Sequence, residues 1–338
     1  MLIHNNFNLK ALNTFGIESY AKYYIELNEE VEFKTLLTNS VFVNSEKLIL
    51  GGGSNILFTK NFNGFVLHNK IKGINITEDS ANHQIVKVGA GENWHEFVLW
   101  TIEHRLGGLE NLSLIPGCVG ASPMQNIGAY GVEIKDTFHQ LEALDLNTGD
   151  KKVFSNNDCN FGYRESIFKN KVKNKYLITN VFFKLKKTPI LNTSYGAINE
   201  ELTKLNILRP TIKDVSDAVI KIRQSKLPNP KELGNAGSFF KNPEIDVEKY
   251  ENLKKVFPKL VSYALPENKY KLAAGWLIEE CGLKGFEINN AAVHVKQALV
   301  LVNKGNCSGK DVLELSNYVI QKVFNKFGVN LEREVNII

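Results

Sequence analysis

The segment that most constrains this chain is a run of seventeen residues, Ile115 to Gly131, which contains four glycines, two alanines and one serine and no charged side chain. Glycine adds no volume to a core and loses more conformational entropy on folding than other residues, so its repeated use needs a reason. Main-chain N–H groups that touch a large ligand supply such a reason. A tight irregular loop without a ligand is the alternative.

Length and composition indicate an ordinary globular protein. The chain has 338 residues, of which 43% are hydrophobic and 23% charged, so two or three domains with their own cores are expected. The formal net charge of +5 suits an anionic small ligand but is too diffuse to indicate nucleic acid. We therefore expect a small-molecule partner and no nucleic-acid partner.

Neither a membrane segment nor a metal or disulfide framework is indicated. Residues 1–10 lack the apolar core of a signal peptide, and no apolar run approaches the roughly 18 residues of a membrane span. We expect a cytoplasmic protein that binds no membrane. The cysteines form no Cys-x-x-Cys pair and have no histidine at ligand spacing, which predicts idle or buried thiols and no metal. They are Cys118, Cys159, Cys281 and Cys307.

The first half of the chain predicts a mixture of strands and helices. An apolar strand at 47–50 runs into the glycine turn Gly51–Asn55, and apolar strand pieces follow it. Alternation and helical spacing predict a strand at 85–88, a helix at 93–105, a hairpin over 141–154 and a strand at 176–185. From residue 188 to 210 the chain reads as a polar, irregular connection that carries Tyr195.

A second region begins near residue 211. Thr211 and Asp214 have the spacing of a capping box that opens a helix ending before Pro228. Beyond it the pattern predicts a helix at 272–281, a strand at 292–302 and a helix at 308–327 capped by Gly328. The last ten residues alternate, with Leu331, Val335 and Ile337 on one face.

Two glycine turns lack the features of the common nucleotide motifs. Gly51–Asn55 has no Gly-Lys-Ser/Thr ending, so it is not a P-loop. Gly89-Ala90-Gly91 is followed by Trp94 where a Rossmann fingerprint needs its third glycine, which favours a turn that ends a strand. Neutral glycine loops of this kind can still hold a pyrophosphate by backbone N–H groups alone.

Two further segments set single polar side chains among apolar ones. Arg164 lies in the aromatic stretch 161–168, where it needs either an anionic ligand or a structural carboxylate. Ser238 lies between small residues and two phenylalanines in Gly234–Pro243, without the Gly-x-Ser-x-Gly elbow of a hydrolase. Its hydroxyl is a candidate proton donor, and a plain glycine-bearing turn is the alternative.

Six motifs together suggest a family. They follow one another as Asn13–Gly16, Gly51–Asn55, Ile115–Gly131, Gly162–Arg164, Gly234–Pro243 and Glu334–Val335. Each is weak alone, but in this order over nearly the whole chain they resemble UDP-N-acetylenolpyruvoylglucosamine reductase (MurB), type I, a flavoenzyme family of bacterial peptidoglycan precursor synthesis.

The resemblance implies an α+β fold. It implies an FAD-binding domain of the vanillyl-alcohol-oxidase (PCMH) type in two subdomains, followed by a C-terminal α+β substrate domain. The implied ranges are 1–66 and 67–210 for the two subdomains, 211–328 for the substrate domain, and 329–338 for a strand that returns to the active site. A substrate-capping tyrosine loop is implied near 190–200, and a monomer is expected.

The resemblance also implies cofactors and contacts. FAD would be bound noncovalently and NADPH would be the reductant. The implied FAD contacts are Gly51, Gly52, Gly53, Ser54, Asn55, Pro116, Gly117, Gly120, Ala121, Ser122, Gln125, Asn126 and Gly128. The implied contacts to the nucleotide-sugar substrate are Tyr195, Lys226, Asn242 and Gln297. Asn336 stands where the family commonly has arginine, which removes a charged contact near the flavin.

The implied activity is that of a UDP-N-acetylmuramate dehydrogenase. NADPH would reduce FAD, and hydride would pass from the flavin to the enolpyruvyl group of the UDP-sugar. Arg164 and Glu334 would stabilise the negative charge that develops toward the carboxylate, and Ser238 would protonate C2. A flavin oxidase that uses molecular oxygen, and a nonenzymatic nucleotide-binding or cell-wall scaffold module, are the alternatives.

Overall fold

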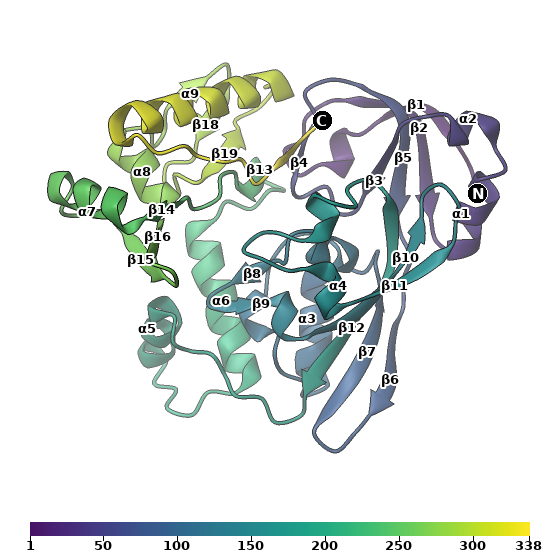
Figure 1. Ribbon diagram of the computed structural model, residues 1–338, viewed down its shortest axis with the longest axis horizontal. Helices are drawn as coiled ribbons and strands as arrows, with labels where there is room; N and C mark the ends of the chain where they lie inside the picture. The colour runs from purple at the N-terminus through teal and green to yellow at the C-terminus, as the bar shows by residue number, and fades with distance from the viewer. The chain divides into compact units, whose positions relative to one another are not determined.

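The computed structural model describes all 338 residues, and they form two compact units, each assembled from separated stretches of chain. Unit 1 comprises Met1–Phe7, Ala21–Gly53 and Phe62–Ser225, and unit 2 comprises Asn8–Tyr20, Ser54–Asn61 and Lys226–Ile338. Helices and strands occur in both units, which confirms the predicted α+β class (Figure 1). The predicted boundaries at residues 66, 210 and 328 stay predictions.

A four-stranded sheet in unit 1 has the order β1-β2-β5-β3. Its strands are β1 His4–Asn8, β2 Tyr20–Leu27, β3 Lys47–Leu50 and β5 Phe62–Asn69. Both β2 and β3 run parallel to β5. Alternate residues of the strands, such as Ile25 and Phe65, are buried with Phe33 of helix α1 (Glu30–Leu36) and Phe42 of helix α2 (Ser40–Val43).

A five-stranded antiparallel sheet, β11-β10-β12-β7-β6, forms the rest of the framework of unit 1. The strands are β6 Ile74–Asp79, β7 His83–Gly89, β10 Phe138–Asp145, β11 Lys151–Ser155 and β12 Tyr176–Lys186. They confirm the predicted strands and the hairpin. Helix α3 (Trp94–Glu103) packs Trp94 and Phe97 against Phe183, and the Asn93 side chain accepts a hydrogen bond from the N–H of Glu96 at its start.

The other elements of unit 1 are short, apart from helix α6. They are 3₁₀ turns η2 Glu110–Leu112, η3 Val119–Met124, η4 Ile134–Asp136 and η5 Ile167–Lys169, strands β8 Gly128–Ala129 and β9 Val132–Glu133, and helices α4 Asn156–Cys159, α5 Gly196–Lys204 and α6 Ile212–Lys226. Asp214 accepts hydrogen bonds from the N–H (2.8 Å) and hydroxyl of Thr211, which confirms the predicted capping box of α6.

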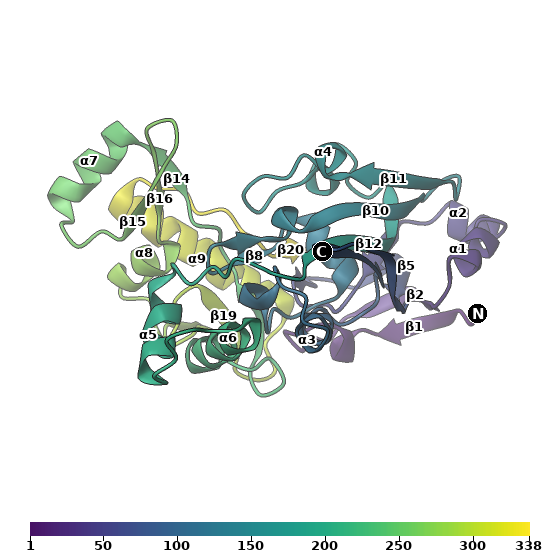
Figure 2. The same ribbon diagram turned by 90° about the horizontal axis from the view of Figure 1, so that it is seen from below.

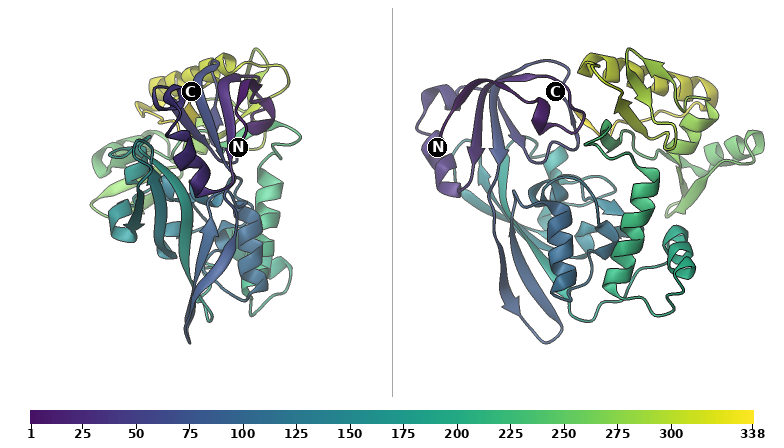
Figure 3. Two further views of the ribbon diagram at one scale, coloured as in Figure 1. Left: turned by 90° about the vertical axis from the view of Figure 1, so that its right-hand side faces the viewer. Right: turned by 180° about the vertical axis from the view of Figure 1, so that it is seen from behind.

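The prediction of an irregular connection over 188–210 is wrong in its middle, because this stretch contains α5. Ile198 and Leu202 of α5 are buried against Ala218, Val219 and Ile222 of α6, and the two helices lie side by side (Figures 1 and 3). Helix α5 has nine residues, and Ile198 and Leu202 are its only buried apolar side chains, so the stretch reads as a polar connection. Its stability comes from tertiary packing that a local pattern does not reveal.

Unit 2 contains a sheet of order β13-β19-β18-β17, a sheet of order β14-β16-β15, and the parallel pair β20-β4. Its elements are η1 Lys10–Leu12, β4 Ile56–Leu57, β13 Gly234–Ser238, β14 Glu244–Asp246, α7 Val247–Val256, β15 Ser262–Leu265, β16 Lys269–Leu272, α8 Ala274–Glu280, β17 Glu287–Ile288, β18 Ala291–Val293, β19 Val300–Asn303, α9 Gly309–Phe327 and β20 Asn336–Ile337. Helix α9 lies along β18 and β19 (Figures 1 and 2). No helix in either unit has the length and apolar character needed to cross a bilayer.

Three predictions for unit 2 can be compared with the structure. The helix over 308–327 is confirmed, including Gly328 as its left-handed cap with φ 62°. The single strand expected at 292–302 is wrong: β18 and β19 form a hairpin in which the N–H of His294 bonds to the carbonyl of Val300 at 2.9 Å. At the end of the chain, where Leu331, Val335 and Ile337 were predicted to share one face, Leu331 and Val335 are buried and Ile337 is half-buried, although only β20 is a regular strand.

Candidate functional site

Unit 1 brings together the glycine turns that stood apart in the sequence. The N–H of Val119 donates to the carbonyl of Glu92 and the N–H of Gly120 donates to that of Ala90, both at 2.9 Å. A Cβ atom on Gly120 would lie 2.5 Å from the Cβ of Ala90. The turn after β7 and the segment 115–131 therefore pack backbone to backbone, which only glycine allows at this position.

The turn Gly51–Gly53 approaches the same segment. A Cβ atom on Gly52 would lie 2.9 Å from the Cα of Gly117, whereas one on Gly51 would meet the Cβ of Cys118 at an ordinary 3.6 Å. Three glycine turns thus meet in unit 1. The turns touch one another through their main chains. A ligand beside them would therefore meet backbone groups rather than bulky side chains, and such a surface fits a large phosphate-bearing cofactor.

Two of the predicted FAD contacts have buried side chains that hold this segment in shape. Ser122 Oγ donates to the carbonyl of Val119 at 2.7 Å. Asn126 Nδ2 donates to Glu133 Oε2 and to the carbonyl of Gly162, both at 3.0 Å, while its Oδ1 accepts from the N–H of Lys135. These bonds fix the path of the backbone past residue 126. Contact of either residue with FAD stays a prediction.

Unusual backbone conformations cluster along this segment. Leu114, Asn126, Tyr130 and Arg164 have φ between 45° and 59°, in the left-handed region that non-glycine residues rarely adopt. Each such residue costs about 1–3 kcal/mol and is retained where the surrounding structure requires it. Arg164 Nη2 donates to the carbonyl of Gly128 at 2.6 Å, which docks the guanidinium directly on the glycine-rich segment.

A second arginine in unit 1 was missed by the sequence analysis. Arg223 Nε donates to the carbonyl of Leu114 at 3.2 Å, and the guanidinium interacts electrostatically with the Tyr130 hydroxyl. Burial lowers the pKa of Arg223, and the charge of Arg164 lowers it further. The two cations therefore repel one another, and no carboxylate pairs with Arg223. The signal in the sequence was an arginine directly after the core residue Ile222, within the apolar stripe of α6.

Tyr195 immediately precedes α5 in unit 1. Its carbonyl accepts a hydrogen bond from the N–H of Ile198 at 2.8 Å, and its ring meets that of Tyr130 edge-on with centroids 5.2 Å apart. The side chain is exposed. Of the predicted catalytic and substrate residues, unit 1 thus contains Arg164 and Tyr195, and both contact the segment 115–131.

Ser238 lies at the end of β13 in unit 2, directly after a β-bulge. Asn235 pairs with Val302 and Ser238 with Val300, so the bulged strand has one more residue than β19 between these pairs. Gly237 allows this with φ 69°, and its N–H donates to Asn235 Oδ1 at 2.9 Å. A bulge redirects the side chains that follow it. Ser238 is exposed, whereas Phe239 is buried.

The C-terminal segment of unit 2 lies beside the bulged strand. The N–H of Glu334 donates to the carbonyl of Phe239 at 2.8 Å, and Asn55 Nδ2 donates to the carbonyl of Glu334 at 3.3 Å. Asn336 donates to the Asn55 carbonyl through both its N–H (3.1 Å) and its Nδ2 (3.0 Å). Within unit 2, the chain around Ser238, Glu334 and Asn55 is therefore tied together by hydrogen bonds.

The predicted substrate contacts Asn242 and Gln297 both lie beside the start of α8. Asn242 Oδ1 accepts from the N–H of Ala274 at 2.9 Å, and a Cβ on Gly275 would lie 3.2 Å from Gln297 Oε1. Lys226 is the exposed last residue of α6. All four cysteines are free thiols, and burial raises the pKa of Cys159 to about 12.

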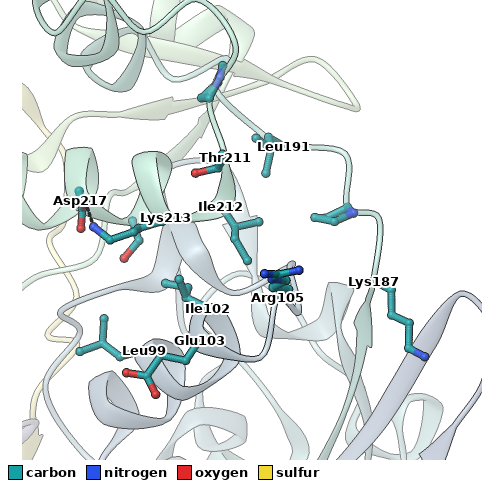
Figure 4. A pocket seen from close by; sticks show the side chains of 13 residues that line it. Leu99, Ile102, Glu103, Arg105, Lys187, Leu191, Thr211, Ile212, Lys213 and Asp217 are labelled. Carbon is teal, nitrogen blue, oxygen red and sulfur yellow. Dashed lines mark hydrogen bonds and ion pairs between the residues drawn. The ribbon is translucent and has the colours of Figure 1, made fainter.

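A groove in unit 1 lies away from these residues. It has a volume of about 700 Å³ and lies between the end of α3 and the two ends of the 187–210 connection (Figure 4). Its floor includes Ile102 and Ile212, and Lys213 at its edge pairs with Asp217 at 2.5 Å. No predicted site residue lines it.

Two family models cover most of the chain. Residues 22–155 match an FAD binding domain, and residues 229–338 match the C-terminal domain of UDP-N-acetylenolpyruvoylglucosamine reductase. The first match contains the three glycine turns, and the second contains Ser238 and Glu334.

Full-length similarity extends to curated and solved proteins. The chain is 53% identical over 339 residues to the UDP-N-acetylenolpyruvoylglucosamine reductase of Flavobacterium johnsoniae, with all of both chains covered. It is 49% identical to the protein of that name from Amoebophilus asiaticus, again over both full lengths. The crystal structure of UDP-N-acetylenolpyruvylglucosamine reductase (MurB) from Thermus caldophilus has the same fold, with TM-score 0.67, 24% identity, and 99% of this chain and 98% of that one covered.

Proposed function

Because this chain belongs to the UDP-N-acetylenolpyruvoylglucosamine reductase family, we infer that it is an FAD-dependent oxidoreductase that uses NADPH to reduce the enolpyruvyl group of UDP-N-acetylglucosamine enolpyruvate. The product is UDP-N-acetylmuramate, a precursor of peptidoglycan, so the enzyme serves cell-wall biogenesis and through it cell shape and division. The observation that carries this function is the 53% identity over the full length, joined to the meeting of three glycine turns inside the FAD-domain match.

The glycine turns are the part of unit 1 that suits FAD. We assign the pyrophosphate to the Gly51–Asn55 turn and the flavin wall to the backbone from Pro116 to Gly128, where main-chain donors can face the ligand. The chemistry that bound FAD would supply is hydride transfer, with NADPH as the hydride source and the enolpyruvyl double bond as the acceptor. We assign FAD binding to residues 1–66 and 67–210, substrate binding to 211–328, and the returning C-terminal strand to 329–338.

Arg164 is assigned to stabilise the charge that develops on the substrate carboxylate. Its guanidinium is already docked on Gly128, and its left-handed backbone fixes the direction of the side chain. A cation held in place before the reaction costs no reorganisation when negative charge appears. Glu334 is assigned to act with Arg164, in protonated form or as part of a polarising hydrogen-bond network.

Ser238 is assigned to protonate C2. A serine hydroxyl is a weak acid, so this role depends on a short and oriented transfer to a strongly basic carbon. The bulge at Gly237 supports the role, because it gives the exposed hydroxyl a direction that a regular strand would not. We assign Tyr195, Lys226, Asn242 and Gln297 to the nucleotide-sugar substrate, and we expect a cytoplasmic monomer.

The test is to isolate the protein, denature it and look for released flavin, and then to follow NADPH oxidation with and without the enolpyruvyl UDP-sugar. The proposal predicts noncovalent FAD and NADPH consumption that depends on the UDP-sugar. Consumption that depends instead on molecular oxygen would favour a flavin oxidase, and a colourless protein that takes up no FAD would favour a scaffold module.

A further inference from the structure

Asn111 is a buried amide that connects two stretches of unit 1 far apart in the sequence. Its Nδ2 donates one hydrogen bond to the carbonyl of Tyr130 at 3.0 Å and another to the carbonyl of Asn192 at 2.8 Å. Both N–H bonds of the amide are therefore used. They join the end of the glycine-rich segment to the chain three residues before Tyr195.

The side chain of Asn192 donates back to the glycine-rich segment, so the two stretches are joined by hydrogen bonds from both sides. Its Nδ2 donates to the carbonyl of Gly131 at 3.0 Å, and its Oδ1 accepts from the N–H (3.3 Å) and the hydroxyl (2.8 Å) of Ser194. Gly131 has φ 80°, and a Cβ there would lie 3.0 Å from Asn192 Nδ2. The glycine thus makes room for the bond, which an alanine would crowd.

The chain after Tyr195 is held as well. Helix α5 follows at once, packed on α6 through Ile198 and Leu202, and Glu201 pairs with Lys221 of α6. The Tyr195 ring also meets the Tyr130 ring. Tyr195 is therefore an exposed side chain on a backbone fixed from both sides.

We propose that Asn111 and Asn192 are positioning residues that hold Tyr195 at a set place relative to the Tyr130–Gly131 end of the glycine-rich segment. This proposal rests on the proposed function, in which Tyr195 contacts the nucleotide-sugar diphosphate. A residue fixed before binding loses less conformational freedom when the ligand arrives, so the bonds act on substrate affinity rather than on hydride transfer.

The test variant is Asn192→Asp, which keeps an acceptor for Ser194 but removes the donor to Gly131. Loss of one neutral hydrogen bond predicts a KM for the UDP-sugar raised about three- to tenfold, with kcat and the rate of flavin reduction by NADPH unchanged. Asn199→Asp, on exposed α5 surface, makes the same charge change and should leave KM unaltered. A KM for Asn192→Asp that stays at the wild-type value, or that rises equally in Asn199→Asp, overturns the proposal.

A double-mutant cycle with Tyr195→Ala separates positioning from a general structural effect. If Asn192 acts through Tyr195, Asn192→Asp raises KM in the parent protein but adds nothing in the Tyr195→Ala background. If the effects of the two substitutions on KM are additive, the positioning proposal is overturned, but the proposed function is not contradicted. If Tyr195→Ala itself leaves KM unchanged, the assignment of Tyr195 to the substrate falls and the proposal with it. Absence of any UDP-sugar-dependent NADPH oxidation in the parent protein would instead contradict the proposed function.

Discussion

The backbone N–H of Glu334 donates a 2.8 Å hydrogen bond to the carbonyl of Phe239, the residue that follows Ser238. This bond, next to the pairing of Phe240 with Arg333, fixes the C-terminal segment against the bulged strand of unit 2. Two residues that the sequence analysis joined only by family resemblance thus lie in neighbouring stretches of one unit, Ser238 at the end of β13 and Glu334 just before β20. Backbone hydrogen bonds hold the irregular stretch around Glu334 in place beside Phe239 and Phe240.

Replacement of Ser238 by alanine should separate the two halves of the reaction. Flavin reduction by NADPH should stay near the wild-type rate, while reduction of the enolpyruvyl substrate should slow by about 10²- to 10⁴-fold, the usual contribution of a positioned acid. Stopped-flow spectroscopy of each half-reaction measures both. Ser262→Ala, at the start of β15 in the same unit, is the control, and equal slowing of both half-reactions in Ser238→Ala would remove the proton-donor role.

Gly52→Ala and Gly51→Ala form a matched pair in one turn. The added Cβ should clash with Gly117 Cα at residue 52 but find ordinary contact with Cys118 at residue 51. Overpacking of this kind costs about 1–3 kcal/mol of stability. Thermal unfolding of the FAD-free proteins should therefore show a lowered midpoint for Gly52→Ala alone. Equal unfolding midpoints would mean that the turn accommodates the added methyl group at residue 52 without loss of stability.

Asn336→Ala should weaken retention of FAD. The change removes the Nδ2 bond to the carbonyl of Asn55 and so loosens a turn assigned to the cofactor. Loss of one neutral hydrogen bond should raise the FAD dissociation constant by up to about tenfold. Titration of FAD-free protein measures this, with Asn325→Ala on exposed α9 surface as the control. An unchanged dissociation constant would show that Asn55 is held by its other bonds.

Acid should destabilise unit 1 through His68. Burial holds the pKa of this imidazole at about 4, and the Tyr24 hydroxyl lies 2.7 Å from its Nδ1. Between about pH 6.5 and 4 the unfolded chain binds a proton that the folded chain does not, so the free energy of unfolding falls as the pH is lowered, by about 3 kcal/mol in total. Denaturant titrations of His68→Gln should show a slope reduced by this amount, since burial also lowers the pKa of His95 and His294, while those of exposed His139→Gln should keep the full slope.

Sequence patterns predicted the long, strongly periodic elements. Helix α9 has a capping serine, a repeated apolar face and a terminal glycine, so its whole length was specified locally. Helix α5 was missed because it is short and has only two buried apolar residues among polar ones. The turn between β18 and β19 was missed because Ala292 to Val302 is rich in β-branched and apolar residues on both sides of it.

The sequence predicted the residues of the candidate site but not the residues that hold them in place. Glycine turns, a lone arginine and a lone serine stand out by composition, and the resemblance gave them roles. Arg223 and Asn111 did not stand out, because a half-buried arginine on a helix and a buried amide in a short turn look like any polar residue in sequence. Their bonds reach Leu114, Tyr130 and Asn192, and such long-range partners appear only when the chain is folded.

The most direct test of the central claim is an anaerobic spectrum. The purified protein is reduced with one equivalent of NADPH in the absence of oxygen, the enolpyruvyl UDP-sugar is added, and the visible flavin band is followed. The account predicts that the band, bleached by NADPH, returns when the UDP-sugar is added, with one UDP-N-acetylmuramate formed per flavin reoxidised. A flavin that stays reduced until oxygen is admitted would contradict it.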